Sequence, residues 1–255
     1  MLELMLFGVL PLAALSIFVA GTIYRVIGWV LPRGNTSLAS VAVRSYSWGV
    51  GSRAAEILKR ITTFYTLLYS DKLLFIGAFL FHWGIFTALI LGHTALFFTE
   101  KQLEAFGITP QLHEELALYV GGAAGLAASS GWIILAVRRV ARRDVRALSF
   151  LDDWFALALV GAIVLLGTYI TLAVHPNYME TVSPWLRYLL SGDLASAVER
   201  LAAAEPSVKA HVLLASLLIA YVPFGKMMHP FAVFFEPTLT QAPYKVDGSL
   251  PTRGR

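Results

Sequence analysis

The fold of this chain is decided by residues 73–99, LLFIGAFLFHWGIFTALILGHTALFFT, a run of 27 residues without Asp, Glu, Lys or Arg. A helix of about 20 apolar residues crosses the roughly 30 Å hydrocarbon core of a bilayer. The run is therefore long enough for a membrane-spanning helix. It also carries two histidines, His82 and His93, within its apolar sequence.

Four other apolar segments flank this run in a chain of 255 residues that is 57% hydrophobic and only 14% charged. Soluble domains are about 45–50% apolar and about 25% charged. The last segment contains Lys226, whose ammonium can extend to the membrane interface. We therefore predict an all-α polytopic membrane protein, a bundle of five transmembrane helices at about 4–30, 73–99, 116–138, 154–176 and 208–230. Residues 1–236 would form this membrane domain, and residues 237–255, with three prolines, an extended cytoplasmic tail.

The basic residues indicate the orientation of these helices. Sixteen of the 20 Lys and Arg residues lie in segments 25–72, 138–153 and 226–255, which alternate along the chain. Basic loops stay on the cytoplasmic side of a membrane. We expect the N-terminus outside and the C-terminus in the cytoplasm. The net charge of +4 follows from this asymmetry and gives no sign of nucleic-acid binding.

The absence of cysteine restricts the chemistry that this chain can perform. It excludes disulfides, thiolate catalysis, cysteine-ligated iron–sulfur clusters and a covalent CxxCH haem site. The remaining candidates to hold a redox cofactor are six histidines, four of which lie in the predicted second and fifth helices.

The spacing of these four histidines predicts two pairs. His82 and His93 are eleven residues apart, about 20° around a helix, and His211 and His229 are separated by five full turns. Because the second and fifth helices run antiparallel, His82 should meet His229 (the inner pair) and His93 should meet His211 (the outer pair). Each pair can provide both axial ligands of a non-covalent haem b, so we predict two such haems with iron held by the four histidines.

Other interpretations of these histidines stay open. A membrane histidine can simply form a hydrogen bond with a neighbouring helix, and a row of them can line the proton path of a cofactor-free transporter. The chain can also be a structural anchor. Two rows on antiparallel helices favour haem, and Gly84 and Gly92 beside the histidines would let a porphyrin approach the backbone. His175-Pro176 is interpreted as the end of the fourth helix.

Three stretches resemble the cytochrome b (gamma) subunit of respiratory nitrate reductase. Phe81-His82-Trp83-Gly84-Ile85 followed by Gly92-His93 resembles its second-helix haem motif, although the histidines here are one residue further apart. His211-Val212-Leu213 followed by VPFGKMMH at 222–229 is similar to its fifth-helix motif, and YVGGAAG at 119–125 to a glycine stretch of its third helix. The resemblance covers about residues 75–235. The continuation HPFAVFFEPTLTQ at 229–241 is more similar to the DsrM family of diheme cytochromes b.

This resemblance implies a subunit of the prokaryotic inner membrane that binds haem b. It would exchange electrons between menaquinone or ubiquinone and a DsrK-like iron–sulfur subunit on the cytoplasmic side. That subunit resembles heterodisulfide reductase, and further subunits would complete a complex of dissimilatory sulfur metabolism. The cytochrome b subunit of a nitrate reductase, or of another quinone-linked oxidoreductase, is the alternative.

The resemblance also implies a quinone site near the start of the third helix. Relatives have a basic residue there, and His113 takes its place, either to donate to a quinone carbonyl and relay a proton or simply as an exposed loop histidine. Glu114 and Glu115 would accept protons, or merely favour the positive end of the helix. Independently of the resemblance, the basic segments follow first from topology. Arg25 or Arg44 in them would also suit the carboxylates of a haem, since arginine pairs well with carboxylates.

Overall fold

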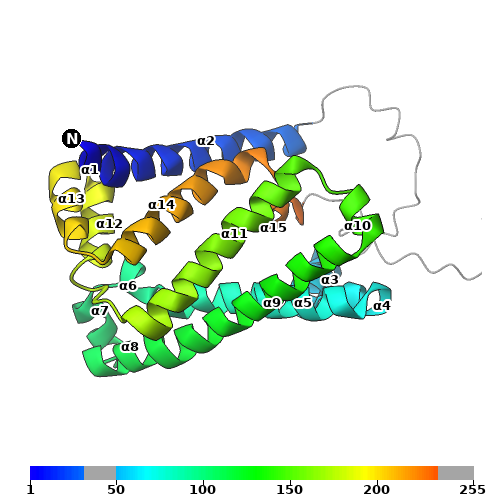
Figure 1. The fold of residues 1–255 in the computed structure, drawn as a ribbon, viewed down its shortest axis with the longest axis horizontal. Coiled ribbons are helices and arrows are strands. Elements are labelled where there is room, and N and C mark those ends of the chain that lie inside the picture. Colours follow the sequence, from blue (N-terminus) through cyan, green and yellow to red (C-terminus); the bar gives the residue numbers. More distant parts are fainter. Residues whose placement is uncertain (32–49, 235–255) are drawn as a thin grey trace, which may run out of the picture.

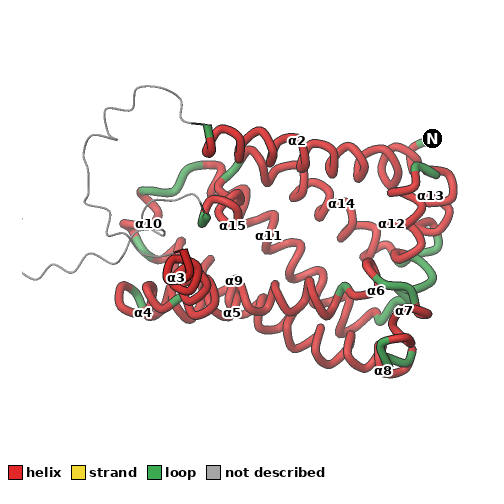
Figure 2. Tube along the Cα trace, turned by 180° about the vertical axis from the view of Figure 1, so that it is seen from behind, coloured by secondary structure: helices red, strands yellow, loops and turns green. Residues whose placement is uncertain are grey.

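The structure is a computed structural model that describes residues 1–31 and 50–234. All regular elements of this part are helical (Figures 1 and 2), and their bounds are as follows. The first half contains α1 (Leu2–Leu4), η1 (Met5–Val9), α2 (Leu10–Val30), α3 (Val50–Thr63), α4 (Tyr65–Ser70), α5 (Lys72–Thr87), η3 (Ala88–Gly92), α6 (Thr94–Phe97), α7 (Glu100–Ala105), α8 (Pro110–Leu116) and η4 (Ala117–Gly121). The second half contains α9 (Gly122–Ala141), α10 (Arg143–Ala147), α11 (Leu151–Tyr169), η5 (Ile170–Val174), α12 (Val182–Ser191), α13 (Leu194–Ala202), α14 (Pro206–Tyr221), η6 (Val222–Phe224), η7 (Lys226–Met228) and α15 (His229–Ala232).

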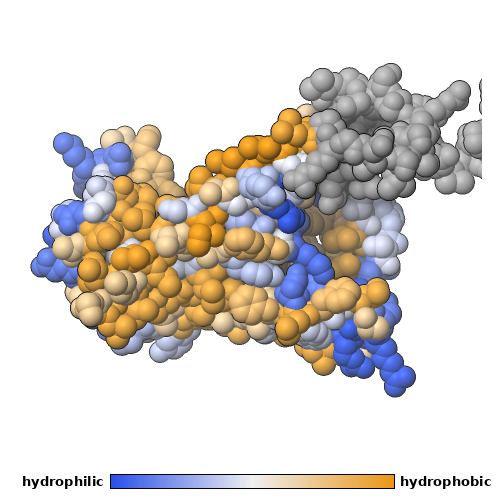
Figure 3. All heavy atoms as spheres, turned by 90° about the horizontal axis from the view of Figure 1, so that it is seen from above, coloured by the Kyte–Doolittle hydropathy of each residue, from blue (hydrophilic) through white to orange (hydrophobic). Residues whose placement is uncertain are grey.

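Five continuous helical segments are long and apolar enough to cross a membrane, which confirms the predicted all-α bundle. They are Leu2–Val30, Lys72–Gly92, Pro110–Ala141, Leu151–Val174 and Pro206–Phe224. Apolar side chains cover the length of the bundle, and hydrophilic residues gather at its ends (Figure 3). An apolar exterior of this kind is stable against lipid rather than water.

The five spans pack in a fixed order. α5 packs on α9, α9 on α11, α11 on α14 and α14 on α2. Figure 1 shows this order, with α2 above, α11 through the middle and α9 with α5 below. α5 carries His82, and α14 carries His211. These two helices make no extensive contact along the part of the chain that the structure describes. Their separation is therefore set by α9 and α11.

Glycine allows α5 and α9 to approach closely. A Cβ atom on Gly84 would lie 2.4 Å from the backbone nitrogen of Ala128, and one on Gly131 would lie 2.3 Å from that of Phe81. Small residues at such contacts let helix backbones meet in a membrane. The expectation that Gly84 makes room for a porphyrin is therefore wrong, because that face is filled by α9. A Cβ atom on Gly92 would lie 3.6 Å from the Cα of Gly121, so this face is likewise next to the neighbouring helix.

The two ends of the bundle are closed differently. At one end α12 and α13 cover the helix termini, where Trp185 Nε1 donates to the carbonyl of Phe7 at 2.8 Å. At the other end Asp71 caps α5 and pairs with Arg138 at 2.8 Å and with Arg142 at 2.7 Å. The backbone N–H of Leu74, followed by Arg138, holds the pKa of Asp71 below its usual range, so this carboxylate stays ionised.

Two spans end earlier than the sequence predicts. The second helical segment ends at Gly92 rather than residue 99, because His93 (φ −113°, ψ 20°) leaves helical geometry. The fifth ends at Phe224 rather than Pro230: Pro223 lacks an amide donor, and Gly225 is extended (φ −108°, ψ −174°). The predicted tail at 237–255 and Arg44 lie outside the described residues.

The close contact between α5 and α9 leads to a prediction about stability. Gly131→Ala places a methyl group against the backbone of Phe81, so it should lower the free energy of unfolding by about 1–3 kcal/mol. Gly28→Ala is the matched control, since a methyl group added at Gly28 would meet nothing within 4 Å. That change should be neutral or stabilising by up to about 1 kcal/mol. Unfolding in detergent would compare the two; equal midpoints would contradict the close packing.

Candidate functional site

The structure brings the inner pair of histidines together. His82 lies on α5 and His229 begins α15, and their ring centroids are 5.9 Å apart with the ring planes at 84°. Nδ1 of His82 donates to the carbonyl of Ala78 at 2.8 Å, and Nδ1 of His229 donates to that of Lys226 at 3.1 Å. These bonds fix the ring orientations and leave each Nε2 as the unprotonated nitrogen that can bind a metal.

The outer pair forms a second site towards the other end of the bundle. The rings of His93 and His211 have centroids 6.4 Å apart and are nearly parallel, at 26°. Nδ1 of His93 donates to the carbonyl of Ala88 at 2.8 Å. Nδ1 of His211 is buried and makes no hydrogen bond with the described residues. A Cβ on Gly167 would lie 2.9 Å from Cε1 of His211, so this glycine makes room for the ring.

Both separations fit one metal ion between two imidazoles. A metal–nitrogen bond of about 2 Å on each side places the two ring centroids about 6 Å apart. The described residues contain no group of three or more His, Asp or Glu side chains that could hold a metal. A pair can therefore provide only two ligands. This donor set suits an iron whose other four ligands come from a macrocycle, rather than a tetrahedral zinc ion.

Aromatic side chains surround the inner pair. The ring of Phe64 lies 5.1 Å from that of His82, and Phe86 lies 6.3 Å away on the next turn of α5. Phe64 separates α3 from α4 and has a left-handed backbone (φ 50°). A non-glycine residue in this conformation is strained, and such strain gathers at functional sites. The short helices α3 and α4 are thus tied to the inner pair.

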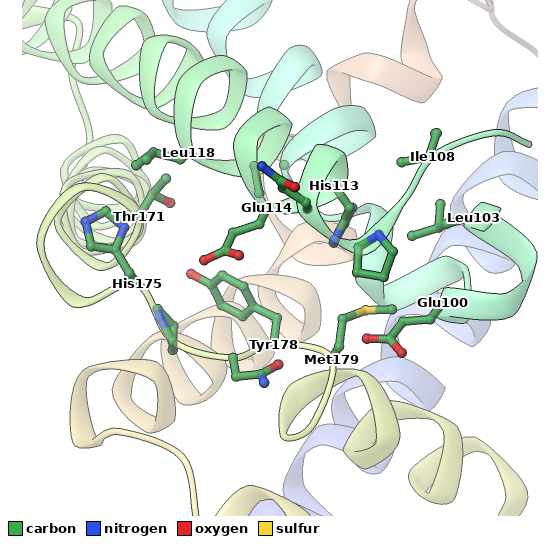
Figure 4. Close-up of a pocket in the computed structure, with 16 residues that line it drawn as sticks. Glu100, Leu103, Ile108, His113, Glu114, Leu118, Thr171, His175, Tyr178 and Met179 are labelled. Atoms are coloured by element: carbon green, nitrogen blue, oxygen red, sulfur yellow. The ribbon is translucent and has the colours of Figure 1, made fainter.

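A cavity of about 520 Å³ lies beside the outer pair. Its volume is in the range of sites for small organic molecules. Figure 4 shows Glu114 and Tyr178 pointing towards one another, with His175 to their left and His113 to their right. Three π-helical turns, η3, η4 and η5, meet at this end of the bundle. Such turns are rare in helices and frequent at functional sites.

The cavity lies next to the residues that adjoin His93 of the outer pair in the chain. Gly92 is one of its lining residues, and Thr94 Oγ1 forms a 2.9 Å hydrogen bond with Nε2 of His113. His93 therefore stands between Gly92, which lines the cavity, and Thr94, which bonds to the lining residue His113. The structure places His113, which the sequence singled out, where a ligand in the cavity would reach it.

Other lining residues carry no clear sequence signal of a site. The sequence marks His175 only as a helix end, yet it lines the cavity and adopts a left-handed conformation (φ 49°). Tyr178 follows in an irregular segment, where no periodicity marks it. Burial raises the pKa of Tyr178 to about 12, so its phenol is a stable hydrogen-bond donor at neutral pH. The His-Pro dipeptide is the only local signal.

Comparison with known proteins agrees with this arrangement. The nitrate reductase gamma subunit family matches residues 41–246. The chain is 30% identical to the Hdr-like menaquinol oxidoreductase cytochrome b-like subunit of Archaeoglobus fulgidus, over 91% of this chain and 78% of that protein. It is 26% identical to the nitrate reductase gamma chain of Bacillus subtilis, over 89% of this chain and 91% of that one.

The fold defines a multi-pass membrane protein with two pairs of facing histidines. The chain belongs to the nitrate reductase gamma subunit family. The resemblance that the histidine motifs indicated is thereby confirmed.

Proposed function

We propose that this chain is the haem-b-binding, quinone-reactive membrane subunit of an oxidoreductase complex. In this proposal it transfers electrons between membrane quinone and an iron–sulfur subunit on the cytoplasmic side. The observation that carries the proposal is the pairing of four membrane histidines at two levels, with ring centroids 5.9 Å and 6.4 Å apart. Imidazole rings at this separation suit bis-histidine ligation of iron.

The four histidines would hold two haems b, one per pair. When bound, haem b supplies a one-electron carrier at each level of the membrane. The carbonyls of Ala78, Ala88 and Lys226 accept from Nδ1 of their histidines and so fix the tautomer with a free Nε2. His82, His93 and His211 are partly buried inside the bundle, whereas His229 is exposed at its end.

The cavity beside the outer pair is the proposed quinone site. Oxidation of a quinol releases two protons with its two electrons, so the site needs proton acceptors. His113 and Glu114 both line the cavity, and either can accept a proton within it. The phenol of Tyr178 stays protonated and is a donor for a quinone oxygen. Menaquinone is the favoured substrate, since the archaeal relative is named as part of a menaquinol oxidoreductase.

The partner is proposed from the same relative and from the charge distribution. The relative is named as part of an Hdr-like menaquinol oxidoreductase, which agrees with the expected DsrK-like iron–sulfur subunit. The role in dissimilatory sulfur metabolism is proposed from the sequence resemblance alone. Lacking cysteine, this chain cannot hold an iron–sulfur cluster through thiolates. The end that carries Arg138, Arg142 and Lys226 would face the cytoplasm of a prokaryote, with the N-terminus outside.

A second candidate is the gamma subunit of a nitrate reductase. The similarity to the Bacillus subtilis chain covers 91% of that protein, which favours this candidate independently. Both candidates share the haem and quinone chemistry and differ in the partner. Co-purification separates them: an iron–sulfur heterodisulfide-reductase-like subunit supports the first, and a molybdenum enzyme the second.

Visible spectroscopy tests the haem ligands. The purified chain should contain two haems b, and His82→Ala or His229→Ala should remove one of them, because a single remaining imidazole cannot hold the iron as tightly. His93→Ala or His211→Ala should remove the other. Reduced-minus-oxidised spectra with haem quantification would measure the loss. Retention of both haems in all four variants, or none in the wild type, would refute the assignment.

The quinone site has a separate test. His113→Gln should keep both haem spectra and slow quinol oxidation by about 10²-fold or more, because a proton acceptor is lost. Thr94→Val removes the hydrogen bond that orients His113, worth about 1 kcal/mol, so it should slow the reaction several-fold. Lys101→Gln, exposed on α7 and outside the cavity lining, is the control. Wild-type rates in His113→Gln would place the quinone elsewhere.

A further inference from the structure

Arg25, near the C-terminal end of α2, has a buried polar atom that is not satisfied by the described residues. Its Nε is buried and makes no hydrogen bond. The guanidinium lies 5.7 Å from the ring centroid of Trp29 on the same helix, a contact that satisfies none of its N–H groups by an oxygen acceptor. An N–H removed from water without an acceptor is costly, and more so when charged. An anion that accepts a hydrogen bond from this N–H would remove that cost.

The position of Arg25 indicates where that anion lies. Phe18, Thr22 and Arg25 share one face of α2, since seven residues bring Arg25 within about 20° of Phe18 around the helix. The ring of Phe18 lies 6.2 Å from that of Phe231, and Thr22 Oγ1 lies 4.0 Å from the sulfur of Met228. These two partners flank the histidine that begins α15. The face that carries Arg25 is therefore turned towards the segment that completes the inner pair.

The described acidic residues leave this guanidinium unpaired. The ion pairs at this end join Asp71 with Arg138 and Arg142, Asp144 with Arg142, and Asp153 with Arg139 and Lys226, and none of them includes Arg25. This arginine has no carboxylate partner among the described residues and lies on the helix face that contacts the residues flanking His229. A group that carries its own carboxylates would pair with it. Haem b carries two of them, and carboxylates in an apolar region need a cationic partner.

We propose that Arg25 binds a carboxylate of the haem held by His82 and His229, and so raises the reduction potential of that haem. This inference rests on the proposed function, because it requires a haem at the inner pair. The planar guanidinium forms paired N–H···O bonds with a carboxylate, which suits the buried Nε together with a terminal nitrogen. Its positive charge favours the arrival of an electron at the neighbouring iron. Arg25 precedes residues 41–246, so the family match does not include it.

Redox titration of the haem-loaded, full-length chain tests the proposal. In Arg25→Gln the equilibrium constant for reduction of the inner-pair haem should fall about tenfold, which corresponds to about 59 mV for a one-electron couple. The outer-pair haem should keep its potential. The variant should also lose the inner-pair haem faster to an external haem acceptor, a readout independent of quinol oxidation.

Two further variants make the result specific. Arg143→Gln removes the same charge from an exposed position on α10 and should change neither potential. Arg25→Lys keeps the charge but not the paired donors, so it should show a smaller fall and faster haem loss than the wild type. It also provides the test if Arg25→Gln does not accumulate. Wild-type potentials and haem loss in Arg25→Lys would then overturn the proposal.

The remaining outcomes separate this proposal from its alternatives. Two haems in the wild type with unchanged inner potential and haem loss in Arg25→Gln would overturn the role of Arg25 and leave the proposed function intact. Absence of haem from the wild type would overturn both. If Arg25→Gln instead loses bound anionic phospholipid while both haems keep their potentials, the anion is a lipid phosphate and the proposal is wrong.

Discussion

The structure depends on holding two helical segments apart at a fixed distance. α5 carries one histidine of the inner pair, and α14 with α15 carries the partners of both pairs, yet α5 and α14 make no extensive contact along their described residues. Their spacing comes from α9 and α11, which pack between them in sequence. Gly84 and Gly131 each face the backbone of the opposite helix and set the distance between α5 and α9. Gly167 on α11 makes room for His211 and so sets the distance between α11 and α14. Small residues that bind no ligand themselves thus position the imidazoles.

Irregular backbone lies beside two of the four paired histidines, His93 and His229, for a physical reason. A carbonyl released from a helix inside a membrane needs another donor. Nδ1 of His93 donates to Ala88, the first residue of a π-helical turn, and Nδ1 of His229 donates to Lys226, just after the break at Gly225. The Nδ1–H of each ring satisfies a carbonyl that the helix leaves free, and the same hydrogen bond fixes the orientation of the ring. The same turns shape the end of the bundle where the cavity lies.

Much of this arrangement could be predicted from the sequence. Apolar runs indicate the five spans, and antiparallel helices with His82 and His93 on one face require the two pairs that the structure brings together. The fifth helix follows its sequence pattern less closely. The spacing predicts five turns of helix between His211 and His229, kinked at Pro223, whereas the chain leaves the helix after Phe224. Pro223 is buried against Gly21 on α2, a tertiary contact that sequence spacing cannot reveal. Tyr178 and His175 escape prediction for the same reason, since only the folded chain brings them to His113.

The central claim is that each histidine pair binds one haem iron, and electron paramagnetic resonance of the oxidised protein tests it most directly. The angle between two axial imidazole planes determines how strongly the d orbitals of low-spin ferric iron are split. The planes are at 84° in the inner pair and 26° in the outer pair. We expect two low-spin signals of different anisotropy, with the more anisotropic one absent from His82→Ala. A single low-spin signal, or high-spin iron in the wild type, would contradict the claim.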